Sequence, residues 1–194
     1  MRLDKKIENQ IKRECLRLLV DGRPNWDVKH TISAVKWMKK LIETEGGNEK
    51  VLIPAIYLHD VGYEKLPTGY SHEFMMKSKK EKDHGLVGSL IAAEYLPKLK
   101  YFSGAEIKRI AYLIKNHNKH KNIKQKDRQL IFEADTMAQI DYENCPPNYD
   151  YKNLKEFLDT TFQERIEYIK TKTGKKLLKE LLPKAKNYLN TMSR

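Results

Sequence analysis

Cysteine is scarce in this sequence, and long apolar runs are missing altogether. Only two cysteines, Cys15 and Cys145, occur among 194 residues, too few for a disulfide framework in a chain of this size. The first residues, MRLDKKIENQIK, lack the apolar centre of a signal peptide. No segment approaches the roughly 18 apolar residues that a membrane-spanning helix needs. We therefore expect a soluble, cytoplasmic protein with free thiols.

Acidic residues are too few to balance the basic ones, and the net charge at neutral pH is +12. A positive net charge raises the rate of encounter with anions without deciding the fold. The lysines are spread over nearly every segment, and no aromatic and basic interleaving or groove-reading motif accompanies them. We therefore expect a small phosphate-bearing ligand rather than nucleic acid, with most lysines on a solvated surface.

The alternation of apolar and polar residues that is typical of strands is also missing, as are internal repeats. Apolar residues recur at helical spacing instead, which predicts an all-α fold. The expected helices lie at about 4–20, 27–45, 48–59, 83–95, 103–117, 128–140, 154–171 and 175–190. We expect one domain over 1–194, with packing helices at about 153–190. The connection 62–82, rich in turn formers and charge, is interpreted as a mobile loop.

Residue types predict where two of these helices begin. Asp27 is a favoured N-cap type, so we expect it to cap the second helix, with Val28 and Ile32 facing inward. Ser103 and Glu106 have the spacing of a capping box, which predicts the start of the fifth helix. Both helices lead toward a histidine, one near its start and the other at its end.

Costly polar residues interrupt the apolar faces of two helices. Residues 55–62 read AIYLHDVG, an apolar run that stops on His59, Asp60 and a glycine expected to end the helix. Asp135 interrupts the apolar face of a later helix in the same way. Buried imidazole and carboxylate groups lose their hydration unless something pairs with them. These residues therefore need a partner, and a metal ion is one candidate.

Four of the six histidines fall on or beside the inward faces: His30, His59, His84 and His117. A lone histidine is more often a core residue than a ligand, but helical bundles build metal sites by projecting such side chains from several helices. Nitrogen and oxygen ligands without thiolate suit first-row divalent ions. Manganese, iron, cobalt, nickel and zinc are all candidates. His72 is interpreted as a surface residue of the loop.

The order of these residues resembles the pattern H…HD…D of the HD-domain superfamily of metal-dependent phosphohydrolases. The four pattern residues are His30, His59, Asp60 and Asp135. The segments WDVKHT, YLHDVG, DHGLVGSLIA, IKNHNKH and EADTMAQID each resemble the corresponding helices of small HD hydrolases. The resemblance covers about 26–141 and implies an HD-domain-like helical bundle.

The resemblance also implies a set of metal ligands. One divalent ion would be held by His30, His59, Asp60 and Asp135. In relatives with two ions, histidines at the positions of His84 and His117 hold the second ion, and the carboxylate at the position of Asp60 bridges both. Asp60 is therefore the expected catalytic residue, and the sequence permits one ion or two.

The implied reaction is hydrolysis of a phosphate ester, in which metal-bound hydroxide attacks phosphorus and positive groups stabilise the phosphoryl oxygens. A phosphomonoester, a nucleotide or a phosphodiester would each serve as the ester. Candidate charge stabilisers beside the ligand-bearing segments are Arg23, Lys65, Lys119 and His120. An ordinary surface cation is the more common role for each of them. Trp26, one helical turn before His30, could line the pocket or stack on a base.

The same residues leave two other functions open. Some members of the superfamily use a di-iron pair to activate oxygen, and these ligand types would serve that chemistry too. A non-catalytic module with a structural metal, whose basic surface holds nucleotide or RNA, is the other alternative. Oxygen consumption without phosphate release would favour the first, and metal-dependent folding without turnover would favour the second.

Overall fold

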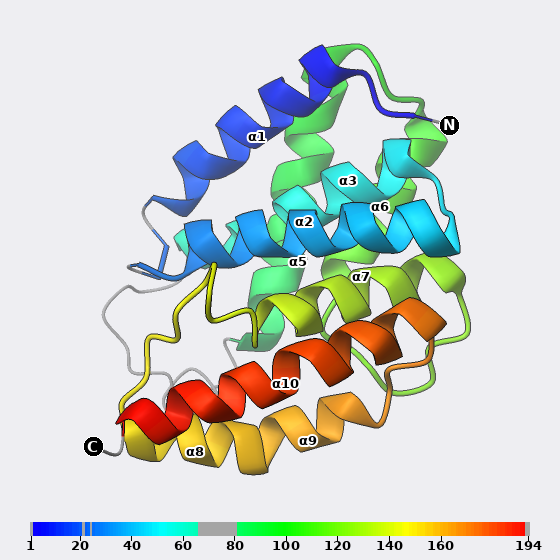
Figure 1. Cartoon of the computed structure of the whole chain (residues 1–194). Coiled ribbons are helices and arrows are strands. Elements are labelled where there is room, and N and C mark those ends of the chain that lie inside the picture. The colour runs from blue at the N-terminus through cyan, green and yellow to red at the C-terminus, as the bar shows by residue number, and fades with distance from the viewer. Residues whose placement is uncertain (1, 21, 24, 66–80, 193–194) are drawn as a thin grey trace.

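The computed structural model describes residues 2–20, 22–23, 25–65 and 81–192, and this part of the chain contains helices and no strand (Figure 1). The all-α prediction is confirmed. The helices are α1 (Lys5–Leu19), α2 (Asp27–Glu45), α3 (Glu49–Leu58), η1 (Val61–Lys65), α5 (Glu81–Tyr95), η2 (Leu96–Leu99), α6 (Gly104–Asn116), α7 (Lys126–Ala138), α8 (Tyr151–Asp159), α9 (Thr161–Ile166) and α10 (Lys172–Met192). Most of the loop predicted at 62–82 lies outside the described residues.

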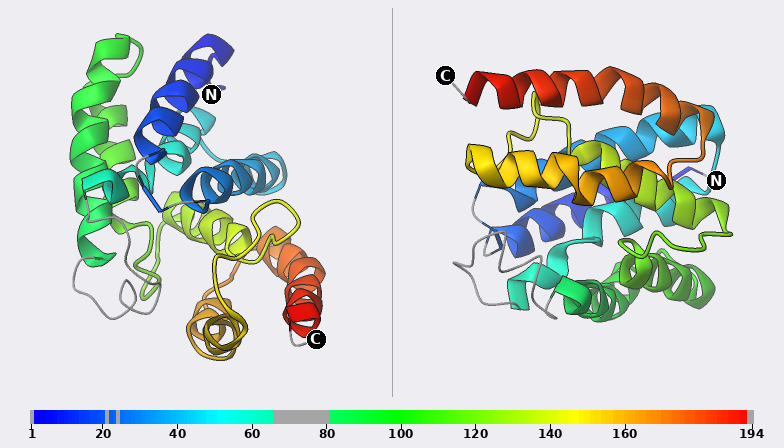
Figure 2. Two further views of the ribbon diagram at one scale, coloured as in Figure 1. Left: turned by 90° about the vertical axis from the view of Figure 1, so that its left-hand side faces the viewer. Right: turned by 90° about the horizontal axis from the view of Figure 1, so that it is seen from below.

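Two hydrophobic clusters organise these helices, and α7 contributes to both. The first cluster joins α1, α2, α3, α5 and α6 with one face of α7, which supplies Leu130 and Ala134. The second joins the opposite face of α7, with Phe132 and Met137, to α8, α9 and α10. Figure 2 accordingly shows α2 and α7 between the α5–α6 pair and the C-terminal helices. As a result, every residue from Gln129 to Ala138 is buried.

The third helix is enclosed almost as completely as α7. All eight residues from Val51 to Leu58 are buried, so α3 carries the segment that follows it into the middle of the first cluster. The Asn48 side chain accepts a hydrogen bond from the Lys50 amide and caps the helix, as its residue type predicts. Pro54 lies inside the helix, which begins five residues before it at Glu49.

The capping box predicted for the fifth helix is confirmed, whereas the prediction for the start of α2 is wrong. Ser103 and Glu106 exchange both hydrogen bonds of the box. Asp27 is the first residue of α2 rather than its cap, because its carboxylate accepts bonds from the backbone and side chain of Arg23. Val28 and Ile32 remain 36% and 39% exposed, since α2 turns the face with its histidine toward the core.

The helix predicted near 154–171 is two helices, α8 and α9, which meet at Thr160. The Thr160 backbone has φ −123° and ψ −81°, outside the helical region. The two helices nevertheless follow one another nearly in line, and the chain turns back into α10 after Ile166 (Figure 2). Pro183 does not interrupt α10, which continues through it to Met192.

The structure bears on the expected absence of a membrane-spanning helix and on the expected free thiols. No helix in the described ranges combines the length and apolar character needed to cross a membrane. Cys15 and Cys145 are both buried and free of disulfide bonds. Burial, with the nearby charge of Asp141, raises the pKa of Cys145 to about 12. This thiol therefore stays protonated and unreactive.

Gly62 permits a close approach between η1 and α5. A Cβ atom at this position would lie 2.7 Å from the backbone nitrogen of Gly88 and would also collide with the carbonyl oxygen of His84. Gly62 is not among the residues with positive φ, so glycine is needed here for space rather than for a left-handed helix end. The contact fixes the part of α5 that carries His84.

We expect Gly62→Ala to lower the free energy of unfolding by at least about 2 kcal/mol, because both colliding groups are backbone atoms that cannot rotate away. Urea denaturation followed by circular dichroism measures the change. Gly104→Ala is the matched control, since nothing lies within 4 Å of its added methyl group and alanine favours the helix. Equal stability of the two variants would contradict the packing argument.

Candidate metal centre

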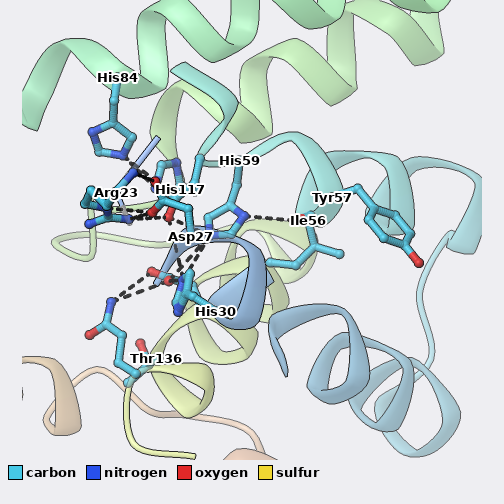
Figure 3. Close-up of polar contacts among 12 residues, drawn as sticks. Arg23, Asp27, His30, Ile56, Tyr57, His59, His84, His117 and Thr136 are labelled. Atoms are coloured by element: carbon cyan, nitrogen blue, oxygen red, sulfur yellow. Dashed lines mark hydrogen bonds and ion pairs between the residues drawn. The ribbon is translucent and has the colours of Figure 1, made fainter. Parts of the chain in front are cut away.

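Six buried side chains from five parts of the chain meet at one place. They are His30 in α2, His59 and Asp60 after α3, His84 in α5, His117 at the end of α6 and Asp135 in α7. Each exposes no more than 4% of its surface. Figure 3 shows the four histidine rings gathered around carboxylate oxygens. Because water cannot hydrate these groups, their hydrogen bonds and charges must be satisfied by one another or by a bound ion.

The first group of donor atoms has the spacing of ligands around one ion. The Nε2 atoms of His30 and His59 lie 3.2 Å apart, and Asp135 Oδ1 lies 3.0 Å from His30 Nε2 and 3.7 Å from His59 Nε2. Asp60 Oδ2 lies 3.7 Å from His30 Nε2 and 3.5 Å from His59 Nε2. Ligands about 2.1 Å from an ion are about 3.0–3.5 Å from one another. The group could therefore hold a divalent ion.

A second group uses the other oxygen of Asp60. The Nε2 atoms of His84 and His117 are 3.2 Å apart, and both lie 3.5 Å from Asp60 Oδ1. Three residues thus surround a second position that could hold an ion. Asp60 presents a separate oxygen to each histidine pair.

Backbone carbonyls and stacked rings orient the histidines. His59 Nδ1–H donates to the carbonyl of Ile56 at 2.8 Å, and His117 Nδ1–H donates to a carbonyl of α6 at 2.7 Å. These bonds leave each Nε2 directed into the cluster. His30 instead stacks on Trp26, with ring centroids 5.5 Å apart and an interplanar angle of 13°. Hydrogen bonds to backbone carbonyls at helix ends therefore orient the rings of His59 and His117, and stacking on Trp26 orients the ring of His30.

Two arginines pair with the two acids of the cluster. Arg23 Nη2 donates to Asp60 Oδ2 at 2.9 Å, while its Nε donates to Asp27 at 2.6 Å. Arg165 Nη2 donates to Asp135 Oδ2 at 2.7 Å. Arg23 was predicted to lie beside the site, and the structure brings it there, bonded to an acid. Asp60 thus faces histidines with both oxygens and Arg23 with Oδ2. Asp135 faces histidines with Oδ1 and Arg165 with Oδ2.

These contacts set the protonation of the cluster. Burial alone would lower the pKa of His59, but Asp60 and Asp135 outweigh it and raise the pKa to about 9. Burial would raise the pKa of the Asp60 carboxyl, but His59 and Arg23 hold it well below its usual range. For Asp135, Arg165 outweighs burial in the same way. Without a bound ion, both acids are ionised and His59 is protonated at neutral pH.

A pocket of about 110 Å³ opens on the cluster. One water molecule needs about 10–15 Å³ by this measure, so there is room for a substrate group. The lining residues are Arg23, Trp26, His30, Asp60, Tyr63, His84, His117, Asn118, Asp135, Gln139, Tyr149, Phe157, Thr161 and Arg165. Trp26, Tyr149 and Phe157 form a continuous aromatic wall, with neighbouring ring centroids 6.3 and 5.8 Å apart.

Not every predicted residue is brought to the pocket. Lys119 Nζ donates to Asn116, and the His120 ring packs against Phe132 and Tyr168 with centroids 5.9 and 4.7 Å away. Neither lines the pocket, although Asn118, immediately before them, does. Their position beside His117 in the sequence misled the prediction because the chain turns away after α6. The side chain of Lys65 and the whole of His72 lie outside the described residues.

Sequence reasoning missed the contribution of the C-terminal helices. The last residues of the pocket lining, Tyr149, Phe157, Thr161 and Arg165, follow the motifs in the sequence. One signal was present, because Phe162, Arg165 and Ile169 have helical spacing and all three are buried. An arginine on an apolar face needs an anionic partner, by the argument that singled out Asp135.

Comparison with known protein families gives one result for this chain. A family model described as HD domain matches residues 27–145, more than half of the chain. The match includes all six residues of the cluster and ends before α8. Comparisons with curated proteins and with solved structures gave no match.

We expect a divalent ion that binds at pH 7.5 to release about one proton, because His59 is protonated in the ion-free cluster and must lose that proton to coordinate. Affinity should therefore rise with pH until it levels off near pH 9. Calorimetric titration of ion-free protein with Mn²⁺, in buffers of different ionisation enthalpy, counts the protons. Proton release on Mn²⁺ binding should vanish at pH 10. The absence of proton release at pH 7.5 would contradict the raised pKa of His59.

Proposed function

Because this chain belongs to the HD-domain family, we propose that it hydrolyses a phosphate ester with one or two bound divalent ions. The observation that carries the proposal is the position of Asp60, whose two oxygens face two separate histidine pairs. A single buried carboxylate shared in this way is suited to bridging two ions about 3.5–4 Å apart, as in two-metal phosphatases.

The donor set fits such ions. His30, His59, Asp60 and Asp135 would hold the first, and His84 and His117 would complete the second together with Asp60. The acids are held ionised, and Nε2 of His59 becomes available for coordination once its proton is released. Oxygen and imidazole nitrogen donors without thiolate favour manganese, iron, cobalt, nickel or zinc over softer ions.

Residues around the cluster would bind and orient the phosphate. A bound ion would supply a Lewis acid that polarises a phosphoryl oxygen and lowers the pKa of bound water. Arg23 lines the pocket beside Asp60, where its remaining N–H groups can meet phosphate oxygens. The walls separate the reacting group from bulk water, which strengthens these interactions.

The aromatic wall favours an ester whose alcohol part carries a planar ring. Trp26 and Phe157 are buried, and Tyr149, which lies between them, is half-buried. A ring stacked on Tyr149 would gain about 0.5–1.5 kcal/mol beyond its buried area. A nucleotide meets this requirement, and a simple sugar or glycerol phosphate does not.

We expect purified protein loaded with Mn²⁺ to hydrolyse p-nitrophenyl phosphate, and we expect Asp60→Asn and His59→Ala to reduce the rate at least about 100-fold, since each removes a ligand. Asp159→Asn is the matched control, because Asp159 is an exposed acid paired with Lys155 on α8. Elemental analysis of each variant reports the bound ions alongside the rate of phosphate release.

Other results of this experiment would replace the proposal. Iron-loaded protein that consumes oxygen and releases no phosphate from any ester would identify a di-iron oxygenase. Protein that folds only with metal, and turns over neither class of substrate, would identify a binding module with a structural ion. Full activity in Asp60→Asn would contradict the role of the bridging carboxylate.

We expect Tyr149→Ala to weaken inhibition of p-nitrophenyl phosphate hydrolysis by adenosine monophosphate several-fold, equivalent to about 1 kcal/mol, while inhibition by glycerol phosphate stays unchanged. The inhibition constants of the two compounds measure the difference. Tyr151→Ala is the control, because Tyr151 is 39% exposed and is not part of the pocket lining. Equal losses for both inhibitors would show that the aromatic wall does not select a ring.

A further inference from the structure

A short helix outside the family match delivers a buried cation to the candidate metal centre. Arg165 lies in α9, between α8 and α10, and is only 8% exposed. Its guanidinium lies over the ring of Phe132 on α7, with its central carbon 4.7 Å from the ring centroid. The side chain therefore runs along α7 in a fixed direction and ends beside Asp135.

The direction of each hydrogen bond made by Arg165 and Thr136 is defined. Nη2 donates to Asp135 Oδ2 at 2.7 Å and to Thr136 Oγ1 at 2.8 Å, and Nε donates to the same hydroxyl oxygen at 3.1 Å. The Thr136 hydroxyl donates its own proton to the carbonyl of Phe132 at 2.7 Å. Thr136 therefore presents an acceptor to Arg165, and the guanidinium is held at two points.

As a result, the two oxygens of Asp135 have different partners. Oδ2 is taken by Arg165, whereas Oδ1 lies 3.0 Å from His30 Nε2. Gln139 Nε2, at 3.4 Å from both oxygens, does not distinguish them. The terminal torsion of aspartate has broad wells, so the backbone of α7 alone would not fix which oxygen faces the histidines.

We infer that Arg165 is a positioning residue of the metal centre, which holds Asp135 so that Oδ1 alone is presented to the ion. The sequence predicted that the C-terminal helices only pack against the rest of the domain. On this inference they also contribute to the metal centre. This inference rests on the ion binding of the proposed function. It does not depend on which reaction the ion supports.

A second tether between α7 and the C-terminal segment provides the control. Glu133, two residues before Asp135, is fully buried and accepts hydrogen bonds from the amides of Lys170 and Thr171 at 2.8 and 3.0 Å. The hydroxyl of Thr171 donates to the same carboxylate. Glu133 thus fastens the start of α10 to α7 without contacting the metal centre. Glu133→Gln weakens the docking of the C-terminal helices and leaves Asp135 untouched.

The experiment compares Arg165→Gln, Arg165→Lys and Glu133→Gln with the wild type. Mn²⁺ titration of ion-free protein, followed by electron paramagnetic resonance, gives the dissociation constant, and thermal unfolding gives the stability. We expect Arg165→Gln to weaken Mn²⁺ binding about 10-fold to 100-fold and to lower kcat for p-nitrophenyl phosphate with little change in KM. Arg165→Lys should recover part of both losses, because lysine keeps the charge but not the two-point contact.

Glu133→Gln should lower the unfolding temperature and leave the Mn²⁺ dissociation constant within about twofold of the wild type. If Arg165→Gln fails to fold, Arg165→Lys carries the comparison, with an expected loss of severalfold in Mn²⁺ affinity. Wild-type affinity in both Arg165 variants would overturn the inference. So would an equal loss of Mn²⁺ affinity in Glu133→Gln, because it would make Arg165 one docking contact among others.

The outcomes separate this inference from the proposed function. Mn²⁺ binding that depends on Arg165, in a protein that hydrolyses no phosphate ester, would overturn the proposed function alone. Hydrolysis together with Mn²⁺ binding that ignores Arg165 would overturn the inference alone. A wild-type protein that binds no divalent ion at the cluster would overturn both.

Discussion

The carboxylate of Asp60 is the group around which the described part of the molecule is organised. It lies at the end of a wholly buried helix, and four histidines from α2, α5, α6 and the end of α3 approach its two oxygens. Placing an anion there is costly unless cations surround it. The helices that supply the histidines are held together by the first hydrophobic cluster. Apolar packing therefore brings the histidines to the carboxylate that they stabilise.

Charge balance explains why arginines accompany the acids. Arg23 precedes α2 and pairs with Asp60, and Arg165 lies in α9 and pairs with Asp135. The removal of either positive partner would leave a buried carboxylate poorly compensated, which is expensive in a low-dielectric interior. The site thus has one arginine that precedes α2 and one from the C-terminal helices. The overall net charge of +12 acts in the same direction at longer range.

The sequence predicted the parts of the site that depend on local patterns. His59 and Asp60 follow an apolar run, and Asp135 breaks an apolar face, so their burial could be inferred from spacing alone, and the HD-domain family was recognised from them. What could not be read locally was the packing between distant helices. Val28 and Ile32 are exposed because α2 rotates its histidine inward, and Gly62 is needed by a helix that begins about twenty residues later. Arg165 was overlooked because its partner lies thirty residues earlier in the chain.

The burial of every residue from Gln129 to Ala138 limits how far this protein can be shortened. A shortened version that stopped at residue 145, where the family match ends, would keep every histidine and aspartate of the cluster. It would also expose Phe132 and Met137, which are fully buried in the intact chain, and the exposed apolar surface would favour self-association. A shortened protein that keeps the cluster would need polar side chains on that face or would have to retain the last three helices.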